Sequence, residues 1–115
     1  MTLPEAIWMD IGCLDDIPVL GARVVKSPAG CVAVFRTSET EACAIDDACP
    51  HKGGPLSQGI VHARSVTCPL HNWVINLDSG TAEGADVGRV RTHAVRVVDG
   101  RLLLDVAQLN VKVAA

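Results

Sequence analysis

Two short motifs combine thiol and imidazole side chains at spacings that suit a metal centre. The first is Cys49-x-His51 and the second is Cys68-x-x-His71, with residues 52–67 between them. A proline follows each cysteine, which fixes one backbone torsion and removes one amide donor in each motif. Thiolate sulfur and imidazole nitrogen bind zinc and iron. The pattern therefore predicts a metal site built from two loops, each of which supplies one cysteine and one histidine.

Two kinds of metal centre fit this ligand set. Four ligands of the Cys2His2 type bind a structural zinc ion in a tetrahedral arrangement. Alternatively, the two cysteines bind one iron of a [2Fe–2S] cluster and the two histidines bind the other iron. Zinc fingers usually pair cysteine with cysteine and histidine with histidine, whereas each motif here offers one of each. The mixed order favours the two-iron cluster. On spacing alone, zinc stays open, and so does a metal-free interaction module in which the four residues are unrelated.

The stretch of residues 47–72, which contains both motifs, differs in composition from the rest of the chain. It holds three of the six prolines, three of the ten glycines and three of the four histidines. It reads as a long irregular insert, and loops of that length in a compact domain are usually functional or disordered. The cysteines and histidines favour a metal that holds the insert together.

The elements that must position these loops read as short strands. β-branched residues are abundant, and turn signals recur about every ten residues. Residues 23–46 predict an antiparallel meander, and Asp99-Gly100 predicts a type I′ turn within a closing hairpin. Helix signals are weak, so we expect an all-β domain, with residues 78–80 as a further hairpin turn. The expected strands cover residues 23–25, 31–36, 42–45, 74–77, 95–98 and 101–105.

Length and composition limit the possible classes of function. The 115 residues predict one domain, 1–115, and the net charge of −3 argues against nucleic acid as the main partner. The first ten residues do not resemble a signal peptide, and no apolar run approaches the about 18 residues that a membrane helix needs. We therefore expect a cytoplasmic protein with reduced cysteines and no membrane partner. Of the five cysteines, Cys13 is the one for which the sequence suggests no role.

The two motifs and their flanks resemble the Rieske iron–sulfur domain. The likeness rests on Cys49-Pro50-His51-Lys52-Gly53-Gly54-Pro55-Leu56 and on Cys68-Pro69-Leu70-His71-Asn72-Trp73, and it extends over about residues 8–105. It implies the Rieske fold, a small antiparallel β sandwich or barrel capped by two cluster-binding loops at about 47–57 and 66–73. It also implies a Rieske [2Fe–2S] cluster, with Cys49 and Cys68 on one iron and His51 and His71 on the other.

A narrower likeness links residues 50–61 and 68–73 to the small subunit of assimilatory NAD(P)H-dependent nitrite reductase. This likeness implies an oxidoreductase subunit that carries electrons without catalytic residues of its own. Its partner would be a large subunit with sirohaem and flavin, which reduces nitrite to ammonium. Rieske-type ferredoxins that serve ring-hydroxylating oxygenases share the fold and ligands, and they stay open as the alternative. High-potential Rieske proteins have an extra cysteine in each loop, where this chain has Gly54 and Leu70, so no disulfide is expected between the loops.

Other cysteine, histidine and tryptophan residues are expected to serve the fold. Cys31 and Cys43 lie in expected strands and should be buried as small apolar side chains. His62 should lie at a loop surface, and His93 should have a structural role before the last hairpin. Trp73 should pack in the core below the second loop.

The tips of the two loops are expected to face a redox partner, because the resemblance places the histidine side of the cluster outward. A lysine beside the first histidine is suited to attracting an acidic partner, and a simply solvated side chain stays open as the alternative. Gly53, Gly54 and Gly59 are expected to let the backbone approach the bridging sulfides. The expected docking surface comprises Lys52, Gly53, Gly54, Leu70 and Asn72.

Overall fold

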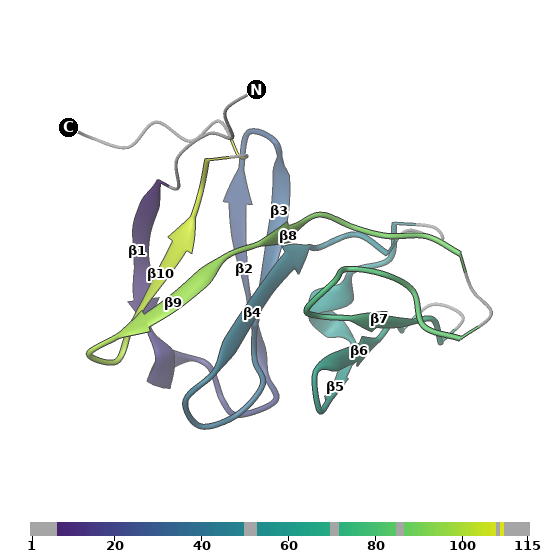
Figure 1. The fold of residues 1–115 in the computed structure, drawn as a ribbon, viewed down its shortest axis with the longest axis horizontal. Coiled ribbons are helices and arrows are strands. Elements are labelled where there is room, and N and C mark those ends of the chain that lie inside the picture. The colour runs from purple at the N-terminus through teal and green to yellow at the C-terminus, as the bar shows by residue number, and fades with distance from the viewer. Residues whose placement is uncertain (1–6, 50–52, 70–71, 85–86, 108, 110–115) are drawn as a thin grey trace.

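Three antiparallel sheets form the chain in the computed structural model, which describes residues 7–49, 53–69, 72–84, 87–107 and 109. Figure 1 shows two of the sheets together as a base, with the third beside them as a cap. The base sheets have the strand orders β1-β10-β9 and β2-β3-β4-β8, and the cap sheet has the order β5-β6-β7. The elements are β1 (Trp8–Cys13), η1 (Leu14–Asp16), β2 (Ala22–Ser27), β3 (Gly30–Arg36), β4 (Ala42–Asp46), η2 (Leu56–Gln58), β5 (Ile60–His62), β6 (Ser65–Thr67), β7 (Val74–Asn76), β8 (Thr92–His93), β9 (Val95–Val98) and β10 (Arg101–Asp105), where η denotes a 3-10 helix.

Strand β3 contributes to two hydrophobic cores, one on each face of its sheet. Val32 and Val34 join the cluster shared with β1 and β10, whereas Ala33 and Phe35 join the cluster shared with the cap. A strand buried on both faces reads as a continuous apolar run, which explains the apolar residue at every position from 32 to 35. The four-stranded sheet is therefore the middle layer, with a sheet of the base on one face and the cap on the other.

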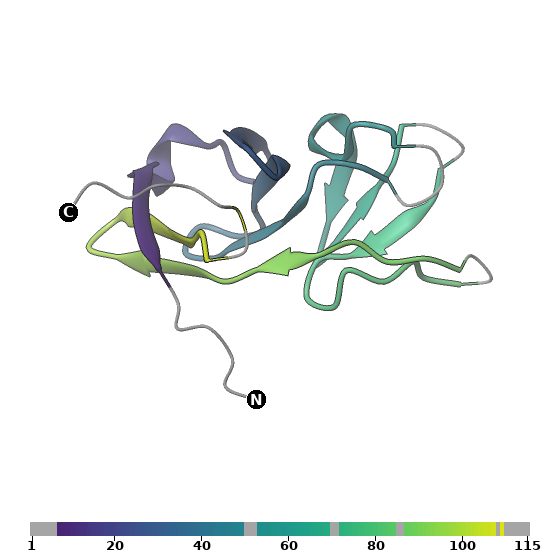
Figure 2. The same cartoon turned by 90° about the horizontal axis from the view of Figure 1, so that it is seen from above.

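The cap is an excursion of the chain between two strands of the middle layer. Figure 2 shows the chain leaving the base after β4 and returning along the segment that leads into β8. Strand β4 pairs with β3 on one side and with β8 on the other. Both ends of the cap are thus fixed to the same sheet, which sets where the cap lies relative to the base.

The meander and the closing hairpin predicted from the sequence are confirmed. Strands β2, β3 and β4 pair in order as antiparallel neighbours, as expected for residues 23–46. In the turn between β9 and β10, Asp99 and Gly100 have φ angles of 50° and 77°. Two successive positive φ angles are what a type I′ turn requires, so the Asp-Gly signal was correctly interpreted.

The interpretation of residues 47–72 as wholly irregular is wrong. Strands β5 and β6 pair from Ile60↔Thr67 to His62↔Ser65, and β6 also pairs with β7. Each of these strands has three residues, which is too short for an alternating pattern to be recognised in the sequence.

Two features differ from the sequence-based expectations. Strand β1 was not predicted, and the turn at 78–80 is followed by less strand pairing than the expected hairpin would have. Strand β1 pairs with β10 across a register shift between Asp10 and Gly12, and such an irregularity obscures a period of two. After the turn, the described residues form the isolated bridges Ile75↔Ala82 and Thr81↔Arg89 instead of a continuous strand.

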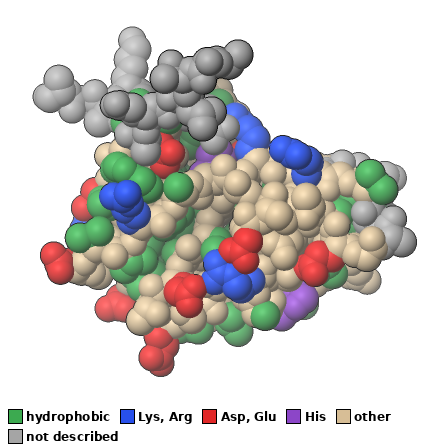
Figure 3. Space-filling model, in the orientation of Figure 1, with side chains coloured by type: hydrophobic (Ala, Val, Ile, Leu, Met, Phe, Trp, Pro, Cys, Tyr) green, Lys and Arg blue, Asp and Glu red, His purple; other side chains and the backbone are tan. Residues whose placement is uncertain are grey.

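Charged side chains of both signs are interspersed on the face shown in Figure 3. This arrangement agrees with the modest net charge of −3. Over the described residues, the structure has no helix that is both long and apolar enough to span a membrane.

Candidate metal centre

The first loop is closed at its base by its own backbone. The amide of Cys49 donates to the carbonyl of Gly54 at 2.8 Å, and the amide of Gly53 donates to the carbonyl of Cys49 at 2.7 Å. Gly53 has a φ of 70°, a left-handed conformation that glycine adopts without strain. The predicted ligand His51 belongs to the segment that these bonds enclose and lies outside the described residues, as do Pro50 and Lys52.

The second loop is closed in the same way and is held by the cap sheet. The amide of Cys68 donates to the carbonyl of Trp73 at 2.7 Å. Directly below it, Thr67 on β6 pairs with Val74 on β7. The predicted ligand His71 lies outside the described residues, together with Leu70.

The two cysteines of the motifs are buried in one apolar cluster. Cys49 is 3% exposed and Cys68 is fully buried, and both belong to the core shared by cap and middle sheet. Leu56, Val66 and Ile75 are buried in the same cluster. Two cysteines brought from separate loops into one buried apolar site suit the thiolate half of an iron–sulfur centre, whose properties depend on solvent exposure. Within the described residues, which exclude His51 and His71, no group of three or more His, Cys, Asp or Glu side chains is arranged to hold a metal ion.

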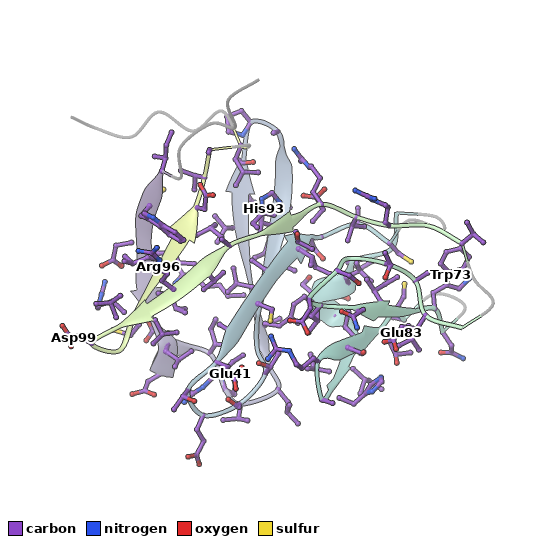
Figure 4. The ribbon with its side chains drawn as sticks, viewed as in Figure 1. Glu41, Trp73, Glu83, His93, Arg96 and Asp99 are labelled. Atoms are coloured by element: carbon purple, nitrogen blue, oxygen red, sulfur yellow. The ribbon has the colours of Figure 1, made fainter. Side chains whose placement is uncertain are left out.

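Trp73 and His62 lie close to the second loop and contact the residues that hold it. Trp73 is half-buried and packs against the core that contains both cysteines, as expected, and Figure 4 shows it at the outer end of the cap. His62 is an exposed residue, also as expected, although it belongs to strand β5 rather than to a loop. Its Nε2 lies 2.9 Å from the hydroxyl oxygen of Thr67, so that hydroxyl already has a hydrogen-bond partner.

His93 is structural, as predicted, and forms part of a polar group on the middle sheet. Its buried side chain places Nε2 2.9 Å from Oδ1 of Asp46, and Nε of Arg91 donates to Oδ2 of the same carboxylate at 2.9 Å. Burial acts to raise the pKa of Asp46, but the hydrogen bonds from Arg91 and His93 outweigh it. The pKa of Asp46 therefore lies below its ordinary value.

The expectations for the two strand cysteines are met in one case and wrong in the other. Cys43 is buried at 9% exposure, and burial raises the pKa of its thiol. Cys31 is exposed. It lies opposite Lys26 near the start of β3, and it belongs to neither core cluster, so a position in a strand was not sufficient to predict burial.

Arg64, in the turn between β5 and β6, joins the cap to the base. Its Nε donates to Asp78 at 2.7 Å, and its Nη1 donates to Glu41 at 2.7 Å in the turn between β3 and β4. Its Nη2 lies 3.4 Å from the sulfur of Cys43. The hydrogen bond to Asp78 is the main reason that the pKa of Arg64 is raised, and the same contact lowers the pKa of Asp78.

Gly59 has a role that the sequence analysis misjudged. A Cβ atom at this position would lie 2.3 Å from the carbonyl oxygen of Thr67 and 2.8 Å from a methyl group of Val66. The close approach at Gly59 is therefore to strand β6, which leads into Cys68, and the expectation of an approach to sulfide does not account for it. For Gly53, no heavy atom lies within 4 Å of such a Cβ.

The sequence reasoning missed two groups of residues that support the loops. One is Arg64 with its carboxylate partners, and the other is Asp47, whose side chain accepts two hydrogen bonds from Ser57. An aspartate two residues before the first cysteine was the available signal for the second group. No local pattern connects Arg64 to Glu41, because the contact depends on how cap and base meet.

Comparisons with known proteins agree with this architecture. A family model for the Rieske [2Fe-2S] domain matches residues 7–97. The ferredoxin subunit of anthranilate 1,2-dioxygenase from Burkholderia cepacia is 34% identical over 108 residues, which cover 91% of this chain and 95% of the relative. Among solved structures, the E. coli protein NirD has a TM-score of 0.76 at 25% identity and covers 87% of this chain and 96% of its own.

A second solved structure matches almost the whole chain. A Mycobacterium tuberculosis protein assigned as an NADH-dependent nitrite reductase small subunit has a TM-score of 0.79 at 23% identity. The match covers 97% of this chain and 100% of that one. The fold, the matched range and the relatives carry one conclusion: the chain belongs to the Rieske [2Fe–2S] domain family, which implies a Rieske cluster and a role in electron transfer.

Proposed function

We propose that Cys49 and Cys68 bind one iron of the Rieske cluster and that His51 and His71 bind the other. The support is the pair of backbone-closed loops, which carry the two cysteines into one buried apolar cluster. When bound, such a cluster supplies one-electron transfer. The chain itself holds the thiols away from water and fixes the two loops that carry the histidines.

We further propose that this single domain, 1–115, is the small electron-transfer subunit of an NAD(P)H-dependent nitrite reductase. The observation that carries this proposal is the likeness of residues 50–61 and 68–73 to that group. The match to NirD, at 25% identity and a TM-score of 0.76, supports it over 87% of the chain. The chain has no G-x-G-x-x-G fingerprint for a dinucleotide, so the electron would come from a flavin- and sirohaem-containing large subunit. A cytoplasmic location goes with this role, because a reducing compartment keeps ligand cysteines as thiols.

The proposed docking surface is the pair of loop tips. Gly53 and Asn72, one in each loop, are exposed, whereas Gly54 is buried, so its expected place in the docking surface is wrong. Lys52 and Leu70 complete the proposed surface from outside the described residues. Contact at the tips would bring the histidine side of the cluster within a short electron-transfer distance of the acceptor.

A second candidate function is electron delivery to a ring-hydroxylating oxygenase. The observation that favours it is a group of three curated relatives, which are ferredoxin components or subunits of dioxygenase systems, share 30–34% identity and cover 84–91% of this chain. Both candidates use the same fold and the same proposed ligands. They differ in the partner protein with which the cluster exchanges electrons.

Reconstitution distinguishes the two candidates. The holo-protein is mixed with a nitrite reductase large subunit, and NAD(P)H-dependent loss of nitrite is followed with and without it. In parallel, the same protein is supplied with a ferredoxin reductase and a dioxygenase, and product formation is measured. Our proposal expects binding to the large subunit and a change in its turnover. Absence of both, together with support of dioxygenase turnover, would establish the second candidate instead.

A pair of matched variants tests the docking surface in the same assay. Leu70→Asp places a charge at the proposed surface, and Val98→Asp places one beside Asp99, at the opposite end of the molecule from Trp73 (Figure 4). Val98 is 46% exposed, so the control substitution avoids the core. We expect Leu70→Asp to weaken partner turnover while keeping the cluster, and Val98→Asp to leave turnover unchanged. A fully active Leu70→Asp protein would show that the docking surface lies elsewhere.

A further inference from the structure

The two cluster loops are anchored in different ways. The second loop lies between β6 and β7, which are paired neighbours in the cap sheet, so a strand ladder holds both of its ends. The first loop runs from β4 in the middle sheet to η2 in the cap. These two elements are not paired strands, so no ladder connects the two ends of the first loop.

The side chain of Asp47 connects the two ends of the first loop instead. Its Oδ1 accepts the backbone amide of Ser57 at 2.7 Å, and its Oδ2 accepts the hydroxyl of Ser57 at 2.9 Å. Hydrogen bonds to a carboxylate are charge-assisted and about twice as strong as bonds between neutral groups. The loop is thus closed twice, by the pair Cys49–Gly54 and, outside it, by the pair Asp47–Ser57.

Both partners of this outer closure are themselves fixed. The amide of Asp47 donates to the carbonyl of Cys31 at 2.9 Å, which ties its backbone to β3. Ser57 lies in η2 next to Leu56, which is fully buried in the cluster that contains both motif cysteines. The Asp47–Ser57 contact therefore joins the middle sheet to η2, whose Leu56 packs in the hydrophobic core around the two motif cysteines.

We propose that Asp47 is a positioning residue for the proposed cluster, and that it acts through Ser57 to set the first loop. The inference rests on the proposed ligand set, because Cys49 and His51 lie inside the segment that Asp47 and Ser57 close. Contacts behind the ligands of a metal orient those ligands and tune the centre. Asp47 thus connects the two ends of the first loop, as the paired strands β6 and β7 connect the two ends of the second.

Three substitutions separate the contributions of the two hydrogen bonds. Asp47→Ala removes both acceptors, whereas Ser57→Ala removes the hydroxyl and leaves the backbone amide bonded to Oδ1. Asp47→Asn keeps a carbonyl oxygen for the amide of Ser57 and offers an amide group to its hydroxyl, so it should restore the positioning. Asp10→Ala is the matched control, because Asp10 likewise accepts a backbone amide, that of Gly12, and side-chain donors, those of Arg101, but does so in the base.

The measurements are the electron paramagnetic resonance spectrum of the reduced isolated protein and the rate at which its visible absorption is lost in the presence of an iron chelator. We expect Asp47→Ala to shift or broaden the spectrum and to lose the cluster about tenfold faster than wild type, Ser57→Ala to lose it about threefold faster, and Asp47→Asn to stay within about twofold. The control Asp10→Ala should lower thermal stability and leave both cluster readouts unchanged.

Wild-type behaviour of Asp47→Ala in both readouts would overturn the inference, as would equal effects of Asp47→Ala and Asp10→Ala. If Asp47→Ala does not fold, Ser57→Ala decides: a changed spectrum with faster loss supports the inference, and a wild-type result overturns it. These readouts use no partner protein, so they stand apart from the choice between nitrite reductase and oxygenase. A wild-type protein without a cluster signal would contradict the ligand set and this inference with it.

Discussion

Replacing Gly59 with alanine tests how closely the cap is packed against the second loop. Gly59 has φ and ψ angles of −78° and 176°, an extended conformation that alanine adopts without strain. The added methyl group would lie 2.3 Å from the carbonyl oxygen of Thr67, although Cβ atoms in proteins essentially never come within 3.0 Å of a heavy atom outside their own residue and its chain neighbours. The effect of this substitution is therefore one of contact alone.

The magnitude follows from what would have to move. The crowded atoms include two backbone oxygens, those of Thr67 at 2.3 Å and Leu56 at 3.1 Å, which cannot rotate away as a side chain would. Strand β6 and helix η2 must separate by several tenths of an ångström. Overpacking of a core costs about 1–3 kcal/mol, and we place Gly59→Ala near 3 kcal/mol because rigid backbone is involved. Since Thr67 precedes Cys68, the shift also displaces a proposed ligand.

Urea unfolding of the holo-protein, followed by Trp fluorescence and by visible absorption, measures both consequences. The control is Gly100→Ala, whose Cβ meets no heavy atom within 4 Å but whose φ of 77° strains alanine by about 1–2 kcal/mol. We expect Gly59→Ala to be the more destabilising and to lose visible absorption before the fold is lost. A Gly59→Ala protein as stable as wild type, with its cluster intact, would refute the packing argument.

Three further predictions concern the joint between cap and base, the pH dependence of stability and the cluster. Arg64→Ala should lower the free energy of unfolding by about 1–2 kcal/mol and speed cluster loss, since exposed ion pairs contribute little singly and more in a network. The control Arg101→Ala breaks a bidentate pair with Asp10 that lies within one sheet, and it should destabilise the fold without faster cluster loss. Equal cluster loss in both variants would contradict the assignment of Arg64 to the joint between cap and base. The pKa of Asp46 is lower in the folded than in the unfolded state. The contribution of Asp46 to folding stability is therefore present above the unfolded pKa of about 3.9 and disappears as pH falls through the folded value. The difference in unfolding free energy between wild type and Asp46→Asn should close below about pH 4, and a difference independent of pH would contradict this. The midpoint potential should lie toward the negative end of the Rieske range of about −150 to +300 mV, because Thr67 is the only hydroxyl residue between residues 67 and 73 and few hydrogen bonds to sulfur disfavour an added electron. Protein-film voltammetry giving a value well above zero would contradict it.

Local patterns in the sequence predicted the parts of the fold that are fixed by local chemistry. The Asp99-Gly100 turn was predictable because only certain residues accept two positive φ angles in succession. Strand β3 was predictable because burial on both faces demands an unbroken apolar run. The short cap strands β5 and β6 were not, because they are held by neighbouring strands and by packing rather than by an alternating pattern of their own.

The candidate site also has parts that local sequence patterns indicate and parts that only tertiary packing creates. The two cysteines and two histidines stand out in the sequence, since metal chemistry restricts the residue types and their spacing, and their role as ligands stays a prediction. The contacts that hold the loops were not, because Arg64 meets Glu41, and Asp47 meets Ser57, only once the cap has packed on the base. Gly59 shows the same limit: the sequence marked it as a close approach, and the structure was needed to identify strand β6 as what it approaches.

The central claim is a two-iron Rieske cluster on two cysteines and two histidines, which passes electrons to a partner. The most direct test is iron and labile-sulfide analysis of the anaerobically purified protein, combined with electron–nuclear double resonance of the reduced state after ¹⁵N labelling of histidine. The account predicts about two irons and about two sulfides per chain, with hyperfine coupling to two histidine nitrogens. It also predicts loss of the cluster in Cys49→Ser and Cys68→Ser, and changed nitrogen signals in His51→Ala and His71→Ala. A stable protein that contains zinc and no iron, or a cluster without histidine coupling, would contradict it.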